Sequence, residues 1–156
     1  MSDLVQVPHF SPVTTDFRRR IEEFEAFCRV QPQIEPVMEH LLHAGMYFRT
    51  ARVEANQVFT NVLVKIPTVL IVNGVAAVNV NGRWHWLRGY NVLAAAAHRK
   101  SIYLTQSATD FTMAFPSQAA TVEEAEREFT DESEQLLSRS QGERDLVMIT
   151  GVTCQG

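Results

Sequence analysis

The sequence is poor in cysteine, in long apolar runs and in surplus positive charge, and each absence excludes a class of protein. Two cysteines in 156 residues are too few for a disulfide framework, so a reducing cytoplasmic location is expected. No apolar stretch approaches the roughly 18 residues of a membrane-spanning helix. The first ten residues also lack the pattern of a secretory signal. A net charge of −4 gives no attraction to nucleic-acid polymers. We therefore expect a cytoplasmic protein that binds neither membranes nor nucleic acid.

Familiar catalytic motifs are also absent. The chain has neither a phosphate-binding loop of the P-loop type nor a Gly-x-Ser-x-Gly elbow. Neither Cys28 nor Cys154 lies near a histidine or a Gly-rich turn, so a catalytic thiol has no support. These absences favour a binding protein over an enzyme.

What the chain does have is a block of short strands between two helices. A helix is expected after Thr14, with Pro32 as its stop, and a second one begins at the capping box Thr121–Glu124. Asn-Gly pairs at 73–74 and 81–82 predict hairpin turns. The segment 34–43 is ambiguous. Strands are predicted at 46–53, 57–65, 68–73, 75–80, 83–88, 90–94, 101–105 and 109–115.

This order predicts a mainly β protein, an antiparallel barrel or sandwich with flanking helices. We expect one domain with four parts. These are an N-terminal extension and helix (1–44), the barrel (45–118), a C-terminal helix (119–138), and a linker with an apolar tail (139–156).

The strand block resembles the cupin family of small jelly-roll barrels over roughly residues 45–115. The first cupin motif falls between Asn56 and Gly74, and the second begins at Gly89. The positions of the family's histidine and glutamate metal ligands are occupied by Val62, Val64, Thr68 and Lys100. Such side chains cannot coordinate a divalent cation. The resemblance therefore implies a cupin-like barrel with no metal and no other cofactor.

Three stretches, IPTVLIVNG, GYNVL and TVEEAEREFTDE, look like parts of small cupin-like proteins of bacteriophages and prophages. This resemblance implies an accessory protein that acts in the cytoplasm of a bacterial host.

The candidate ligand-binding residues are mostly basic or aromatic. Tyr47 and Arg49 share one strand face and suit a planar anionic group. Lys65 and Lys100 are the only lysines. Four alanines at 94–97 leave space beside the basic triplet 98–100. This triplet could bind a phosphate or a carboxylate. The alternative for each is a solvated or surface-paired side chain. The predicted set is Tyr47, Arg49, Lys65, Thr68, His98, Arg99 and Lys100, with no catalytic and no metal-binding residue.

Candidate interface residues are large and apolar. Trp84 and Trp86 point to the same face of a strand, as an exposed interface or as core. The apolar run that begins at Leu146 must cover a surface, either its own sheet edge or a neighbouring subunit. We predict a homo-oligomer with Trp84, Trp86, Leu146, Val147 and Ile149 at its interface. His40 and His43 have a metal-like spacing, but surface histidines are the preferred interpretation.

These observations predict a non-catalytic protein that binds or sequesters a small anionic molecule in a metal-free barrel, with a host-defence signalling nucleotide as one candidate. The first alternative is an oligomeric inhibitor of a host protein or a structural virion component. The second is a metal-independent lyase or hydrolase that uses Lys100 and His98 as acid and base.

Overall fold

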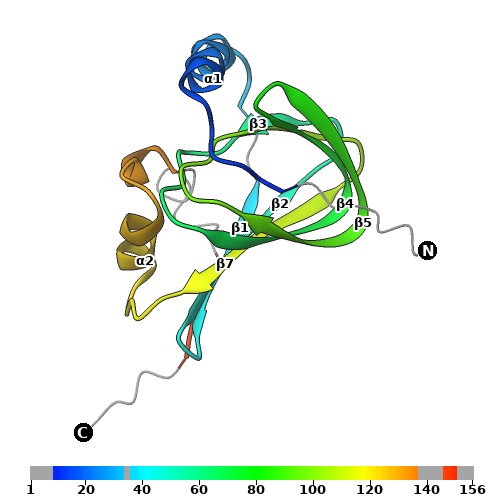
Figure 1. Cartoon of the computed structure of the whole chain (residues 1–156). Helices are drawn as coiled ribbons and strands as arrows, with labels where there is room; N and C mark the ends of the chain where they lie inside the picture. The colour runs from blue at the N-terminus through cyan, green and yellow to red at the C-terminus, as the bar shows by residue number, and fades with distance from the viewer. Residues whose placement is uncertain (1–8, 34–35, 137–145, 151–156) are drawn as a thin grey trace, which may run out of the picture.

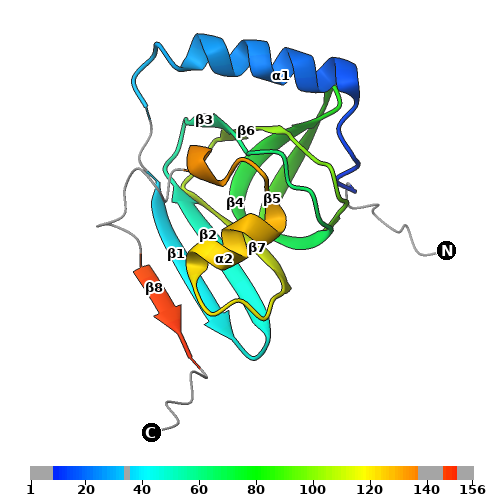
Figure 2. The same cartoon turned by 90° about the vertical axis from the view of Figure 1, so that its left-hand side faces the viewer.

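The chain is a mainly β protein in which one mixed sheet curls into a half-barrel flanked by two helices (Figures 1 and 2). The computed structural model describes residues 9–33, 36–136 and 146–150. Its elements are α1 (Thr15–Cys28), β1 (Val37–His43), β2 (Met46–Val53), β3 (Val58–Thr60), β4 (Thr68–Val80), β5 (Arg83–Ala95), β6 (Ile102–Thr105), β7 (Thr109–Pro116), α2 (Val122–Phe129), the 3-10 turn η1 (Ser133–Gln135) and β8 (Leu146–Ile149). The predicted fold class is confirmed.

β4 is the strand that joins the two halves of the sheet. The strand order is β3-β6-β4-β7-β2-β1-β8, and β5 pairs with β4 along its whole length. On the other edge of β4, residues 69–73 pair with β7 and residues 76–79 pair with β6. At this change of partner the sheet curls into the half-barrel of Figure 1.

The hairpin turn predicted at Asn73-Gly74 is wrong, because β4 runs straight through these residues. The loop between β6 and β7 meets β4 here: the amide of Val75 donates to the Ser107 hydroxyl at 2.9 Å. A Cβ on Gly74 would lie 2.8 Å from Cα of Thr109. The glycine therefore serves a close backbone approach rather than a turn.

Other strand boundaries also differ from the prediction. The segments 83–88 and 90–94 form the single strand β5, because Gly89 pairs with Gly74 inside the long β4–β5 ladder. The segment 57–65 is a strand only at β3, followed by an isolated bridge between Val64 and Arg99. The ambiguous segment contains β1. The predicted turn at Asn81-Gly82 is confirmed, with positive φ angles of 51° and 90°.

Both predicted helices are present, with the caps that the sequence indicates. The hydroxyl of Thr14 accepts from the amide of Phe17 at 3.2 Å, and Thr121 accepts from Glu124 at 3.2 Å. The Glu124 carboxylate accepts from the amide of Ala120, one residue before the cap. Figure 2 shows α1 across the end of the sheet near β3 and β6, with α2 in front of β2 and β7. The helices thus close two sides of the half-barrel.

The predicted apolar run is a strand on its own sheet edge as far as Ile149. β8 pairs with β1 in parallel, with Leu146 opposite Glu39 and Ile149 opposite Leu42. The rest of the predicted linker and tail, residues 139–145 and 151–156, lies outside the described residues. Within the described ranges, none of the helices has the length and apolar character needed to cross a membrane.

Candidate ligand-binding site

A cavity of about 180 Å³ lies in the lumen of the curled sheet, between the strands and the segment that follows α2. We call it the lumen cavity. Most of its wall is apolar, including Val53, Phe59, Val64, Leu70, Phe111 and Met113. The polar or charged lining residues are Arg49, Thr60, Asn61, Arg99, Tyr103 and Gln135. The cavity is therefore an apolar space with basic groups in its wall.

Three stacked or edge-on aromatic rings form one part of the wall. The centroids of Phe59 and Tyr103 lie 4.9 Å apart in a stacked pair. Phe111 meets both rings edge-on, at 5.1 Å from Phe59 and 5.4 Å from Tyr103. β3, β6 and β7 each supply one ring, so the curl of the sheet itself builds this aromatic wall.

Arg99 is a buried cation in the wall of the lumen cavity. It is 3% exposed, and its Nη2 donates to the Thr68 hydroxyl at 2.6 Å. Its Nη1 donates to the carbonyls of Ala96 at 3.1 Å and Ile66 at 3.4 Å. Burial lowers the pKa of Arg99. Among the described residues, no carboxylate lies within ion-pair distance of its guanidinium.

Arg49, by contrast, reaches the cavity already paired. Its Nη1 lies 3.2 Å from Oε2 of Glu126, whose side chain is 2% exposed. The guanidinium also lies 5.7 Å from the ring centroid of Phe129, in cation–π geometry. The pair joins β2 to α2. Arg49 therefore contributes donors to the cavity wall while Glu126 balances its charge.

Lys100 faces a different hollow. Its side chain is 4% exposed, and Nζ lies 2.7 Å from Oε1 of Glu25 on α1. Glu25 also accepts from the Thr60 hydroxyl at 2.8 Å. Glu25 and Lys100 line a hollow of about 440 Å³ beside α1 and do not line the lumen cavity. The two hollows adjoin, because Thr60 and Asn61 line both.

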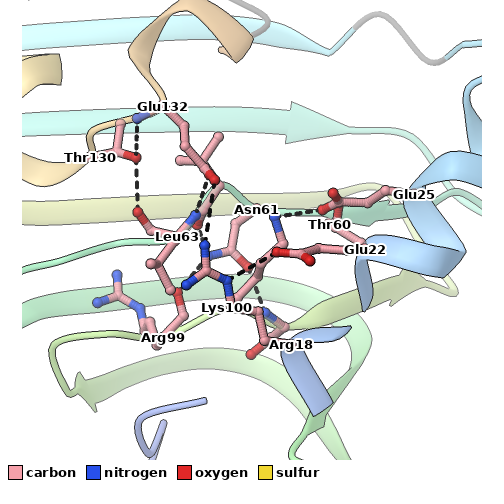
Figure 3. Close-up of polar contacts among 12 residues, drawn as sticks. Arg18, Glu22, Glu25, Thr60, Asn61, Leu63, Arg99, Lys100, Thr130 and Glu132 are labelled. Atoms are coloured by element: carbon pink, nitrogen blue, oxygen red, sulfur yellow. Dashed lines mark hydrogen bonds and ion pairs between the residues drawn. The ribbon is translucent and has the colours of Figure 1, made fainter. Parts of the chain in front are cut away.

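Figure 3 shows this polar network between α1, the segment after β3 and the segment after α2. Arg18 lies 3.1 Å from Glu22 and 4.0 Å from Glu132. Glu132 in turn accepts from the amide of Leu63 at 3.0 Å. No dashed contact in Figure 3 joins the Arg99 guanidinium to these carboxylates. The carboxylates of the network thus bind Lys100 and Arg18 rather than Arg99.

The remaining predicted ligand residues lie outside the lumen cavity. Lys65 is at the surface, with its Nζ 2.7 Å from Asp131, and His98 is exposed. Tyr47 is fully buried against the rings of Phe115 and Phe129. Thr68 contacts Arg99 directly. Of the predicted set, Arg49 and Arg99 therefore line the lumen cavity, and Thr68 binds the Arg99 guanidinium.

His40 corrects the interpretation of the histidine pair as surface residues. His40 is 2% exposed, and its Nδ1 lies 2.7 Å from the Tyr47 hydroxyl. His43 is exposed. The difference arises because this segment is a strand, in which side chains alternate between faces, whereas a helix would bring both rings to one face.

The donor set of the lumen cavity does not fit a divalent cation. Val62 and Val64, which the sequence resemblance predicts at two metal-ligand positions, are lining residues of the cavity. None of the described lining residues is a histidine, cysteine or carboxylate. Residues 9–33, 36–136 and 146–150 contain no group of three His, Cys, Asp or Glu side chains placed to hold a metal. An arginine-bearing wall repels a cation.

The predicted interface residues have exposed side chains. Trp84 and Trp86 are 49% and 50% exposed on the outer face of β5, where Arg88 lies over Trp86 at 5.5 Å. Leu146 and Val147 on β8 are 60% and 53% exposed. Ile149 is 39% exposed.

The sequence did not indicate several residues in or beside the cavity. Phe59, Tyr103 and Phe111 lie on separate strands, and only the register of the curled sheet brings them together. Glu126 lies in an acidic helix whose composition suggests exposure to solvent. Its position four residues after Val122 nevertheless places it on the buried face of that helix. That spacing was the one available signal.

Comparison with known proteins gives a likeness in fold. No family model and no curated protein sequence matches this chain. A cupin superfamily protein from Desulfitobacterium hafniense is 11% identical, with a TM-score of 0.46 over 56% of this chain and 82% of its own. The cupin-2 domain of an XRE family transcriptional regulator from Enterobacter cloacae is 12% identical, with a TM-score of 0.44 over 53% of this chain and 99% of that one.

A salicylate 1,2-dioxygenase from Pseudoaminobacter salicylatoxidans is 16% identical, with a TM-score of 0.46 over 83% of this chain and 40% of its own. Two of these three proteins are named as cupins, and none of the likenesses assigns an activity to this chain.

Proposed function

We propose that the protein is a non-catalytic binding protein that holds a small anionic ligand in the lumen cavity. The observation that carries this proposal is Arg99, a guanidinium 3% exposed in the cavity wall without a carboxylate partner among the described residues. A buried charge is unfavourable unless an opposite charge compensates it. An anion in the cavity would supply that compensation.

Arg99 and Thr68 have defined parts in this proposal. The Thr68 hydroxyl and two backbone carbonyls hold the guanidinium in place before a ligand arrives. Because the Arg99 side chain is already ordered, binding would cost little side-chain entropy. Arg49 would add a donor while remaining paired with Glu126. Lys65, His98, Lys100 and Tyr47 would take no direct part.

The test is thermal unfolding of the full chain with a panel of anions. A ligand at about 100 times its Kd should raise the free energy of unfolding by about 2.7 kcal/mol. We expect at least one small anion to raise Tm in proportion to the logarithm of its concentration, and Arg99→Gln to abolish this shift. Lack of a shift with every carboxylate, phosphate and nucleotide tested would contradict the proposal.

The sequence resemblance to phage proteins supports a biological setting for such a ligand. We propose that the protein acts in the cytoplasm of a bacterial host and withdraws a small anion there, with a signalling nucleotide as one candidate. Native mass spectrometry of protein purified from infected cells tests this setting. Release of a host anion of defined mass would support it, and protein that carries only buffer ions would count against it.

A second candidate function is an oligomeric protein-binding component, and one observation favours it. One face of β5 carries four exposed apolar or aromatic side chains with Arg88 among them, and β5 has only β4 as a ladder partner among the described strands. Those side chains are Trp84, Trp86, Tyr90 and Val92. Exposed aromatic side chains are typical of protein interfaces. We propose that two copies of the chain associate through this face.

Sedimentation equilibrium tests this association. We expect native protein to sediment as an oligomer and Trp86→Ser to shift it toward the monomer. Val58→Ser is the control, since Val58 is an exposed apolar residue on β3, away from β5. A native protein that stays monomeric at high concentration would rule out self-association through β5.

A further inference from the structure

The described wall of the lumen cavity carries one uncompensated positive charge. Of its two arginines, Arg49 is balanced by Glu126 at 3.2 Å, whereas Arg99 faces only a hydroxyl and carbonyl oxygens. Those three acceptors leave the Nε–H of Arg99 with no acceptor among the described residues. The charge balance therefore calls for a single negative charge, placed where a carboxylate can accept from Arg99.

The size and the chemistry of the cavity restrict the rest of the ligand. Its volume is about 180 Å³. An apolar cavity of about 150 Å³ is large enough to hold a benzene ring. Phe59, Tyr103 and Phe111 offer ring faces and edges, and the remaining wall is largely aliphatic. Such a wall favours an apolar body over a sugar or a second charge.

We infer that the lumen cavity binds a compact apolar monocarboxylate, with an aromatic ring or a short branched chain, whose carboxylate pairs with Arg99. This inference rests on the proposed function and narrows its ligand. The ring or chain would lie against the aromatic wall, and the carboxylate would accept from the Nε side of the guanidinium. One ligand would thus both complete the hydrogen bonds of Arg99 and fill the apolar space.

A nucleotide fits these features less well. Its phosphate carries more charge than Arg99 alone balances, since Arg49 is already paired with Glu126. The sugar hydroxyls would also lose their hydrogen bonds to water against a wall of Val64, Leu70 and Met113. Inorganic phosphate would pair with Arg99 but leave the aromatic wall uncovered.

Isothermal titration calorimetry of the full chain at pH 7 tests the inference with four probes: benzoate, benzyl alcohol, inorganic phosphate and adenosine monophosphate. Benzyl alcohol matches benzoate in shape and lacks its charge. We expect benzoate to bind at least about tenfold more tightly than each of the others, because a charge-assisted hydrogen bond to a buried guanidinium exceeds a neutral one. Equal affinity for benzyl alcohol would overturn the assignment of Arg99 as the carboxylate partner.

Two variants locate the binding. Arg99→Gln should weaken benzoate binding at least about tenfold and leave benzyl alcohol nearly unchanged. Arg83→Gln removes an exposed arginine at the start of β5 and should change neither affinity. If Arg99→Gln does not fold, the comparison of benzoate with benzyl alcohol on native protein still decides the question.

The outcomes separate this inference from the proposed function. Binding of adenosine monophosphate or phosphate without binding of benzoate would overturn the monocarboxylate and leave the proposed function standing. No binding of any anion would overturn both. Benzoate binding that Arg99→Gln leaves unchanged would place the carboxylate elsewhere and overturn the inference.

Discussion

Nζ of Lys100 lies 2.7 Å from Oε1 of Glu25, and this ion pair joins the strand block to α1. The lysine side chain is 4% exposed and the glutamate side chain 17%. The sequence suggested Lys100 as a ligand-binding residue, because it is one of only two lysines and ends the basic triplet after four alanines. In the structure its charge is balanced within the chain, and Arg99 is the cation that faces the lumen cavity.

Loss of the Glu25 charge should destabilise the protein. Glu25→Gln keeps an acceptor for the Thr60 hydroxyl but leaves the Lys100 ammonium buried without its counter-ion. We expect the free energy of unfolding in urea to fall by about 3 kcal/mol. Adding Lys100→Met should recover most of this loss, because the buried charge is then removed as well.

Lys65→Met is the matched control, since Lys65 is the only other lysine and its partner Asp131 has a side chain 84% exposed. Its effect should stay within about 0.5 kcal/mol. A Glu25→Gln effect as small as that of Lys65→Met would mean that the pair contributes nothing to the attachment of α1.

Gly74 should tolerate alanine far less than Gly89, although the two face each other in the β4–β5 ladder. Both have positive φ, +148° and +73°, but only at Gly74 would a Cβ meet backbone, 2.8 Å from Cα of Thr109. Gly89→Ala should cost about 1–2 kcal/mol from the left-handed backbone alone. Gly74→Ala should cost more than about 3 kcal/mol. Urea unfolding measures both values, and equal costs would contradict the close approach of the β6–β7 loop.

Tyr103 gives the protein a pH dependence at high pH. Burial raises the pKa of Tyr103, opposed by the positive charge of Arg99 and by the Ser101 hydroxyl. A raised pKa in the folded state means that Tyr103 stabilises the protein below the ordinary tyrosine pKa. This contribution is lost as the pH rises through the folded-state pKa.

Tyrosinate absorbance of native protein minus that of Tyr103→Phe reports this group alone. We expect the difference to appear only above about pH 10 in the folded protein, and near pH 10 when both proteins are unfolded in urea. A difference that appears below pH 10 in the folded protein would show that Tyr103 is not buried beside the cavity.

The sequence predicts the fold class well, because strand and helix patterns are local. The helix caps at Thr14 and Thr121 and the turn at Asn81-Gly82 each depend on residues at most three positions away. All three predictions are confirmed. Asn73-Gly74 fails for the opposite reason. The residue that requires its glycine is Thr109, which is distant in the sequence and close only in the sheet.

The site was predictable only in part. The sequence identifies Arg49 and Arg99 as candidate anion-binding residues, but it cannot assign their counter-ions. Glu126 on α2 pairs with Arg49, and Glu25 on α1 pairs with Lys100. These pairs depend on how the two helices pack against the sheet, and they leave Arg99 without a carboxylate among the described residues. The aromatic wall is likewise invisible in the sequence, since its three rings meet only after the sheet curls.

The most direct test of the central claim is methyl NMR of the native protein with benzoate. We predict nuclear Overhauser contacts from the benzoate ring protons to methyl groups of Val64, Leu70 and Met113, which line the lumen cavity. Contacts to Val69 and Val92 should be absent, because both are exposed on other faces of β4 and β5. Contacts confined to such exposed methyl groups would contradict a ligand site in the lumen.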